Sequence, residues 1–298
     1  VCQPGVSSTT HRDLLGRLRQ PGRHLSAQFK LEESFRSNMT VQAYQQAFDR
    51  IQRYIQAGDC YQVNLAQRLS ATYTGDPWLA YKALRPVAAA PFSAYLALAD
   101  NAAVISLSPE RFLSLHGHHV ETAPIKGTRP RHPDPAADRQ AVRELRASEK
   151  DRAENLMIVD LLRNDLGRSC VPGSIHVDRL FEVQSLATVH HLVSTISGEL
   201  TADREAAQLL RDSFPGGSIT GAPKRRAMQI IAELEPDPRQ VYCGSLLYIS
   251  ADGRMDSNIA IRTLQCNGGE IHCWAGGGIV ADSRCEQEYQ ETWDKVGK

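Results

Sequence analysis

Residues 258–275 carry the pattern that decides the expected fold, reading Asn-Ile-Ala-Ile-Arg-Thr-Leu-Gln-Cys, then Asn-Gly-Gly, then Glu-Ile-His-Cys-Trp-Ala. Two strand-like runs flank a short turn whose residues tolerate positive φ, which is typical of an antiparallel hairpin. A second short turn, Ala251-Asp-Gly, follows a strand-like run at 241–249. Because parallel neighbours need long crossover connections, these turns predict mainly antiparallel sheets rather than a βαβ array.

Hydrophobic periodicity predicts the other elements. Residues 60–73 form an expected strand in which Gln62, Asn64 and Arg68 share one face; this face either lines a site or meets solvent. Thr40 and Gly58 are expected to begin and end a helix. The remaining strands are expected at 93–99, 103–108, 111–115, 174–183 and 190–196, and the remaining helices at 78–84, 136–147, 148–166, 203–212, 223–234 and 283–296. We expect one large α+β domain with two packed, mainly antiparallel sheets and helices outside.

The composition is that of a globular protein, with 42% hydrophobic and 23% charged residues among 298 and a formal net charge of zero. This balance gives no indication of binding to nucleic acid or an anionic membrane. There is no apolar run near 18 residues and no signal-peptide pattern. The seven cysteines are scattered and form no C-x-x-C pair, which favours a reducing compartment. We therefore expect a soluble, cytoplasmic protein.

The two ends of the chain suggest its organisation. Residues 1–35 are rich in Gly, Pro, Arg and Ser without a clear period, so we expect a linker or the remnant of an N-terminal region. The chain starts at Val1 rather than at a methionine, and we expect it to be a fragment whose N-terminal portion is missing. Residues 36–298 are expected to form the functional domain.

One lysine stands out in the stretch Ala123–Arg131, which reads Ala-Pro-Ile-Lys-Gly-Thr-Arg-Pro-Arg. Pro124 and Pro130 limit the freedom of the expected loop, and Gly127 permits backbone geometry that a side chain would forbid. Held in this way, Lys126 is either a surface charge, a counter-ion for an acidic ligand or an amine nucleophile.

Carboxylates on two expected helices suggest a cation site. Glu154 lies in a helix whose apolar stripe is Leu156, Val159, Leu162 and Leu166, and Glu288 and Glu291 are three residues apart on one helix face. Oxygen ligands from two helices suit magnesium, although acids on solvated helix faces would show the same spacing. Glu110 is expected at a strand junction, where it is either a general acid or the partner of Arg111 or another nearby base in a salt bridge.

Two glycine-rich loops suggest an anionic ligand. Phe214–Lys224 contains Gly-Gly-Ser-Ile-Thr-Gly and leads into an expected helix near Pro223, and Trp274–Ala281 contains Gly-Gly-Gly. Arg262 is a charge in an apolar run, which suits either a ligand carboxylate or an internal acid. His190 and His191 are strand neighbours that face opposite sides, so a shared metal is a poor interpretation.

Five stretches together resemble the chorismate-utilising enzymes, a family that includes aminodeoxychorismate, anthranilate, isochorismate and salicylate synthases. They are Asp59–Arg68, Leu107–Arg111, Asp151–Leu161, Pro215–Lys224 and Ala275–Ser283. The resemblance extends from about Ser37 to Lys298, and its strongest likeness is to the component I group of the aminodeoxychorismate synthases. It implies a chorismate-binding catalytic domain over 36–298 that serves 4-aminobenzoate and folate synthesis.

The resemblance also implies residue roles. Lysine at position 126 distinguishes aminodeoxychorismate synthases from anthranilate synthases, which carry alanine. The neutral amine of Lys126 would attack C2 of chorismate and expel the C4 hydroxyl, with Glu110 as proton donor, before ammonia adds at C4 and releases the lysine. Glu154, Glu288 and Glu291 match the magnesium (Mg²⁺) ligands. The positions that match substrate contacts are Arg262, Tyr248, Thr220, Gly221, Gly277, Gly278, Lys295 and His191.

Three further implications concern specificity and partners. Isochorismate-type enzymes carry a water-activating lysine at the position of Gln62, so the glutamine favours an amine nucleophile. Pro91, Phe92 and Ser93 match part of a tryptophan-binding pocket, without indicating whether tryptophan binds. The chain lacks a cysteine-histidine glutaminase signature, which implies that ammonia comes from a glutamine amidotransferase subunit in a heterodimer or from solution. The alternatives are an anthranilate synthase-like lyase and a catalytically silent paralogue that only binds.

Overall fold

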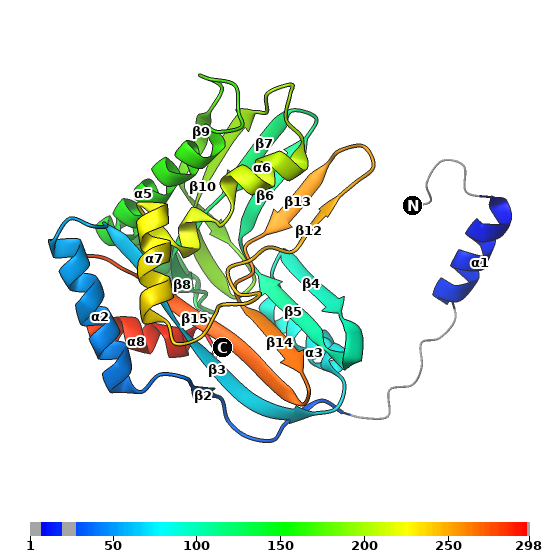
Figure 1. Cartoon of the computed structure of the whole chain (residues 1–298), viewed down its shortest axis with the longest axis horizontal. Coiled ribbons are helices and arrows are strands. Elements are labelled where there is room, and N and C mark those ends of the chain that lie inside the picture. The colour runs from blue at the N-terminus through cyan, green and yellow to red at the C-terminus, as the bar shows by residue number, and fades with distance from the viewer. Residues whose placement is uncertain (1–6, 20–27, 297–298) are drawn as a thin grey trace.

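The computed structural model describes residues 7–19 and 28–296, in which helices surround two β-sheets (Figure 1). The helices are α1 (Ser8–Arg19), α2 (Val41–Gln56), α3 (Pro77–Ala88), α4 (Pro135–Ala147), α5 (Glu149–Leu166), α6 (Ala206–Ser213), α7 (Lys224–Leu234) and α8 (Cys285–Asp294), with the 3₁₀ turns η1 (Ala99–Asn101) and η2 (Gly217–Ile219). The strands are β1 (Lys30–Leu31), β2 (Arg36–Ser37), β3 (Gln62–Thr74), β4 (Phe92–Ala97), β5 (Ala103–Ser108), β6 (Arg111–His116), β7 (His119–Ala123), β8 (Ile125–Pro130), β9 (His176–Ser185), β10 (Val189–Glu199), β11 (Gly221–Ala222), β12 (Leu247–Ile249), β13 (Met255–Asn258), β14 (Thr263–Asn267) and β15 (Glu270–Ile279).

The two sheets have interleaved connections. The first sheet has the order β1-β3-β15-β14-β5-β4, with β2 and β11 also paired to β3. The second has the order β12-β13-β6-β7-β10-β8, with β9 also paired to β10. Every pairing between these strands is antiparallel, so the predicted α+β fold with two mainly antiparallel sheets is confirmed.

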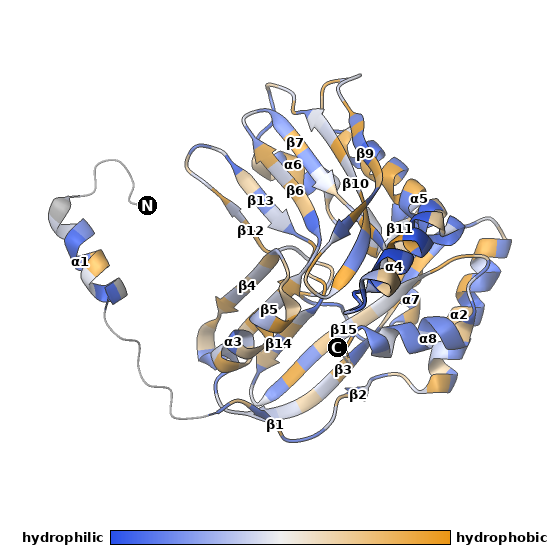
Figure 2. Ribbon diagram, turned by 180° about the vertical axis from the view of Figure 1, so that it is seen from behind, coloured by the Kyte–Doolittle hydropathy of each residue, from blue (hydrophilic) through white to orange (hydrophobic). Residues whose placement is uncertain are grey.

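Helices cover the sheets because each has one apolar face. Tyr44 and Ile51 of α2 pack with Val63 of β3 and Ile230 of α7, while α4 and α5 lie against the second sheet. Figure 2 shows largely hydrophilic residues on α4 and α8, as expected of helices that bury a single stripe. Helix α2 starts as predicted, because the hydroxyl of Thr40 accepts a hydrogen bond from the Ala43 amide.

The chain passes from one sheet to the other four times, and two of these crossings meet. The first of the two, Pro109-Glu110, joins β5 to β6, and the second, 259–262, joins β13 to β14. The Ile259 amide donates to the Glu110 carbonyl at 3.1 Å, and the Leu107 amide donates to the Arg262 carbonyl at 2.9 Å. Chemistry-bearing side chains at both crossings are thereby held close to the junction of the sheets.

The second crossing corrects one prediction. Residues 258–266 were expected to be one strand, but their apolar run spans the change of sheet, and Arg262 has φ 49° in the left-handed region. An uninterrupted apolar run therefore reflects burial on both sides of the crossing rather than a continuous strand.

Other predictions need smaller corrections. The expected loop at Lys126 is strand β8, because it pairs with β10 at the edge of the second sheet. Within 241–249 only Leu247–Ile249 is a strand, and Cys243 has positive φ. The predicted stripe of α5 fails at Leu156, which is 46% exposed, whereas Asn155 and Ile158 are buried.

The expected linker contains regular structure. Residues 8–19 form α1, which lies apart from both sheets, and Lys30–Leu31 pairs with β3 (Figure 1). The rest of the expected linker, residues 1–6 and 20–27, lies outside the described residues. Among the described helices, none combines the length and apolarity needed to cross a bilayer.

Candidate functional site

Strand β8 places Lys126 beside Glu110 and the η2 turn. The Lys126 ammonium lies 3.5 Å from the Ser218 carbonyl oxygen, and the Ser218 side chain is close enough to the Glu110 carboxyl to lower its pKa. Gly127 makes this possible, because its φ of +79° suits glycine and a Cβ there would lie 2.8 Å from Asp151 Cγ. The strand can therefore pass close to α5 while Lys126 reaches the junction of the sheets.

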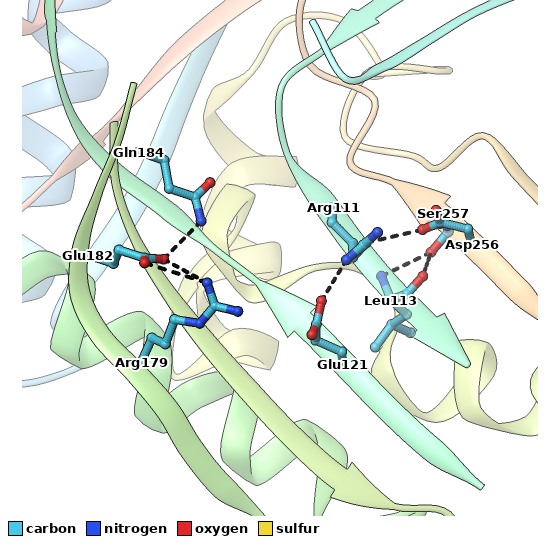
Figure 3. A network of polar contacts seen from close by, with 8 residues as sticks. All are labelled: Arg111, Leu113, Glu121, Arg179, Glu182, Gln184, Asp256 and Ser257. Carbon is cyan, nitrogen blue, oxygen red and sulfur yellow. Dashed lines mark hydrogen bonds and ion pairs between the residues drawn. The ribbon is translucent and has the colours of Figure 1, made fainter. Parts of the chain in front are cut away.

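Glu110 is a buried acid with an unusual protonation equilibrium. Burial raises its pKa to about 7, although the Ser218 hydrogen bond, the Lys126 charge and the Ile125 amide act in the opposite direction. The alternative of a salt bridge with Arg111 is wrong, because Arg111 pairs with Glu121 and Asp256 (Figure 3). A carboxyl with this pKa is able to donate a proton near neutral pH.

The three predicted metal ligands share Lys150 as a neighbouring positive charge. Lys150 lies between two of them, 3.9 Å from Glu154 and 3.7 Å from Glu288. Burial raises the pKa of Glu154, and the nearby Glu288 charge adds to this, while Lys126 and Lys150 lower it. For Glu291, burial alone would raise the pKa, but Lys295, at 2.7 Å, brings it below its usual value.

In residues 7–19 and 28–296, no three His, Cys, Asp or Glu side chains are already arranged as a metal site. The acids are nevertheless close enough for Glu154 and Glu288 to shift each other's electrostatic environment. Lys150 was not singled out from the sequence, because one lysine in a charged helix resembles any solvated charge.

The glycine triplet of β15 separates the acids from β3. A Cβ on Gly277 would lie 2.8 Å from Glu288 Oε2, and one on Gly278 would lie 2.8 Å from Gln62 Nε2. Glycine is therefore required at positions 277 and 278, because a side chain there would clash with Glu288 and Gln62. Gln62 is buried, and in the described structure neither its amide nitrogen nor its amide oxygen has a hydrogen-bond partner. Such unpaired groups point to a polar ligand, so the polar face of β3 is an interior face.

The other glycine loop is fixed against β3. Gly221 pairs with Val63, and its φ of +140° brings its backbone so close to Gln62 that a Cβ would lie 2.1 Å from the Gln62 carbonyl oxygen. The buried Thr220 hydroxyl donates to the Gly216 carbonyl at 3.0 Å. Helix α7 then begins after Pro223, as the sequence predicts. Ser218, in the centre of this loop, is the contact that sequence reasoning missed.

His191 and Arg262 form a polar pair next to β8. Burial and the Arg262 charge lower the pKa of His191 to about 4, so the ring is neutral at pH 7. One ring nitrogen lies 2.9 Å from the Thr128 hydroxyl, and the other is buried without a partner in the described structure. The Arg262 guanidinium forms no ion pair with any described acid, which leaves it available for a ligand carboxylate.

The remaining predicted residues are the substrate contacts Tyr248 and Lys295 and the tryptophan-binding residues Pro91, Phe92 and Ser93. Tyr248 is 60% exposed on β12, opposite Asp256, and no described contact joins it to Lys126. Phe92 is on β4 at the edge of the first sheet, where the Arg111 guanidinium lies 5.2 Å from its ring. Ser93 donates to the Ala90 carbonyl. Lys295 donates to the Gly276 carbonyl at 2.7 Å, which places it next to the glycine triplet.

The fold and site define an α+β protein with an amine, an acid of raised pKa and further carboxylates around one polar interior. The family model described as chorismate binding enzyme matches residues 6–298, and the chain belongs to this family.

Three similar proteins place the chain more closely. It is 56% identical to aminodeoxychorismate synthase component 1 of Salmonella typhimurium over 91% of this chain and 59% of that protein. It is 46% identical to anthranilate synthase component 1 of Streptomyces coelicolor over 88% of this chain and 52% of that protein. The crystal structure of anthranilate synthase component I from Streptococcus pneumoniae superimposes with a TM-score of 0.88 at 34% identity, covering 97% of this chain and 65% of that one. The chain thus spans less than two thirds of the length of these relatives.

Proposed function

We propose that this chain converts chorismate and ammonia to 4-amino-4-deoxychorismate, the aminodeoxychorismate synthase reaction, with residues 36–298 as the catalytic domain. The observation that carries the proposal is that Lys126 and Glu110 both lie next to Ser218. A primary amine is thereby close to a carboxyl with a pKa of about 7. The name of the Salmonella relative, 56% identical, supports the same reaction.

In the proposed reaction, the neutral amine of Lys126 forms a bond to C2 of chorismate while the ring double bond shifts. The C4 hydroxyl takes the proton of Glu110 and leaves as water, and the lysine nitrogen loses a proton. Ammonia then forms a bond to C4 and gives up one proton, the double bond shifts back, and the bond between C2 and Lys126 breaks as the lysine nitrogen takes one proton. The proton that the lysine nitrogen lost in the first half returns Glu110 to its protonated form. Glu110 and Lys126 are the catalytic residues of this scheme.

Magnesium fits the carboxylates of α5 and α8. Glu154, Glu288 and Glu291 supply oxygen ligands, and the Lys150 ammonium already acts as a counter-cation between two of them. When bound, the ion would hold the ring carboxylate of chorismate and balance part of the charge of a dianionic substrate. Gly277 lets the backbone of β15 lie directly against Glu288, because a Cβ there would be 2.8 Å from Glu288 Oε2.

The remaining predicted residues would bind the substrate. Arg262 lacks a described counter-ion, and His191 has a buried ring nitrogen without a described partner, so both suit the oxygen atoms of chorismate. Thr220, Gly221, Gly278, Lys295 and Tyr248 stay in this role as predictions. The tryptophan pocket at Pro91, Phe92 and Ser93 also remains a prediction.

A partner is part of the proposal. Proteins named component 1 work with a second component, and we propose that a glutamine amidotransferase subunit delivers ammonia to this chain. A cytoplasmic location is supported by the cysteines in the described part of the chain, all of which are free.

The product decides between the proposal and its alternatives. The chain is incubated with chorismate, Mg²⁺ and ammonium, with and without an amidotransferase and glutamine, and the products are separated by chromatography. We expect 4-amino-4-deoxychorismate. The similarity to the Streptomyces coelicolor protein favours anthranilate as the competing product, and its appearance without an added lyase contradicts the proposal. A folded protein that binds chorismate without turnover would instead indicate a silent paralogue.

A further inference from the structure

A buried ion pair lies directly behind the Ser218 loop. The side chains of Arg239 and Glu235 are only 13% and 5% exposed, and they meet through two hydrogen bonds. Arg239 Nε donates to Glu235 Oε2 at 2.8 Å and Nη2 donates to Oε1 at 2.6 Å. This planar, two-point contact fixes the orientation of the guanidinium.

The pair joins three segments of backbone. Arg239 Nη1 donates to the Ile219 carbonyl at 2.9 Å, and Nη2 donates to the Asn64 carbonyl at 2.6 Å. Glu235 Oε1 accepts a hydrogen bond from the Ala66 amide at 2.9 Å. One guanidinium and one carboxylate therefore hydrogen-bond to the η2 turn and the middle of β3, directly after the end of α7.

The η2 turn has a second polar support on β3: Asn64 Nδ2 also donates to the Ile219 carbonyl at 2.9 Å, and the Asn64 amide donates to the Thr220 carbonyl at 2.9 Å. On another side of the turn lies a cavity of about 550 Å³, lined by Ile219, Thr220, Glu235 and Arg239 among others. On the side of this cavity, the Arg239 guanidinium supplies the hydrogen bond to the turn. Ser218 is the neighbour of Ile219 and touches both Lys126 and Glu110, so a shift of the turn would move both contacts.

We propose that Arg239, oriented by Glu235, is a positioning residue that holds the η2 turn so that Ser218 meets Lys126 and Glu110. This role rests on the proposed function of Lys126 and Glu110. Arg239 does not face the substrate; it acts through the carbonyl of Ile219, and Glu235 prevents it from turning away.

The test uses two variants that keep both charges, Arg239→Lys and Glu235→Asp, because removal of one partner of a buried pair leaves an uncompensated charge. The matched control is Arg226→Lys, on the preceding helix α7, where the Arg226 guanidinium pairs with Asp59 at 2.7 Å instead of with the η2 turn. For each protein, kcat and KM for chorismate and the thermal unfolding curve are measured. The titration of the Glu110 carboxyl is followed by infrared difference spectroscopy against Glu110→Gln.

We expect kcat to fall about 10- to 100-fold in both charge-conserving variants while KM changes less than about threefold and unfolding remains cooperative. Glu110 should titrate at a higher pH, because a displaced Ser218 no longer lowers its pKa; Lys126 is the other charged group that acts on it. Arg226→Lys should match the wild type in both measurements.

An unchanged kcat, or an unchanged Glu110 titration in a folded variant, would overturn the positioning role. If Arg239→Lys does not fold, Glu235→Asp decides, since it shortens the contact by one methylene only. Absence of 4-amino-4-deoxychorismate from the wild-type assay would refute the proposed function instead, and the titration would still report whether Arg239 controls the surroundings of Glu110.

Discussion

Glu110 and Glu288 are equally buried carboxyls, 4% and 3% exposed, in opposite surroundings. Glu110 lies at a crossing between sheets, with a hydroxyl, an amide and a single lysine nearby, and burial dominates its pKa. Glu288 lies on α8, where the Ser283 hydroxyl donates to it at 2.7 Å and Lys150 lies 3.7 Å away. Burial alone therefore does not assign a role; the neighbours make one acid the proposed proton donor and the other a candidate metal ligand.

The largest effect is expected where the proton donor is removed. Glu110→Gln keeps the shape of the side chain but cannot supply a proton to the leaving hydroxyl, so kcat should fall about 10²- to 10⁴-fold. Steady-state kinetics at pH 7 measures this loss. A wild-type kcat in the variant would show that the C4 hydroxyl leaves without Glu110.

The same acid should make activity and stability depend on pH. Because its pKa is raised from 4.5 to about 7, kcat/KM should decline above about pH 7 as the protonated form disappears. The stability that Glu110 contributes in its neutral form is complete below its unfolded pKa and is lost as pH rises through the folded one. At pH 8 the wild type should therefore be less stable than Glu110→Gln by about 3 kcal/mol, and the difference should vanish near pH 4.

Chemical denaturation at both pH values checks this difference in the free energy of unfolding. Equal stability of the wild type and Glu110→Gln at pH 8 would mean that Glu110 ionises at no cost, in contrast to its buried position, where Ser218, Lys126 and the Ile125 amide offset burial only in part.

Substitution of Glu288 should change the affinity for Mg²⁺ rather than the pH dependence of kcat/KM. Glu288→Gln should weaken the apparent affinity for Mg²⁺ by at least about tenfold, without shifting the high-pH limb of kcat/KM. Activity as a function of Mg²⁺ concentration and isothermal titration calorimetry measure the affinity. Glu286→Gln is the matched control, because Glu286 is exposed on the same helix. Wild-type Mg²⁺ affinity in Glu288→Gln would remove α8 from the metal site.

The smallest expected effect concerns Gly127 on strand β8. Gly127→Ala should lower the free energy of unfolding by about 1–3 kcal/mol, since φ is +79° and the new methyl would meet Asp151 and Leu145. Gly253→Ala isolates the contribution of the clash, because Gly253 has φ +81° with no neighbouring atom within 4 Å. Urea denaturation of both variants gives the difference. Equal losses would show that backbone strain, and not the approach of β8 to α5, requires glycine at 127.

The sequence predicted the antiparallel sheets because short turns such as Asn267-Gly-Gly constrain local geometry. It misplaced Arg262, since an apolar run looks the same in a strand and in a buried crossing between sheets. It predicted the acids of the site but not Ser218 or Arg239, which act through backbone carbonyls and carry no recognisable spacing. Contacts between distant segments of this kind depend on the assembled fold.

The central claim, that Lys126 is the nucleophile, is tested most directly by intact-mass spectrometry. The protein is mixed with chorismate and Mg²⁺ without ammonia, denatured in acid and weighed, and the modified peptide is sequenced. The wild type should gain the mass of chorismate less one water on Lys126, and Lys126→Ala should gain nothing. An adduct of the same mass in Lys126→Ala would place the nucleophile on another residue and contradict the account.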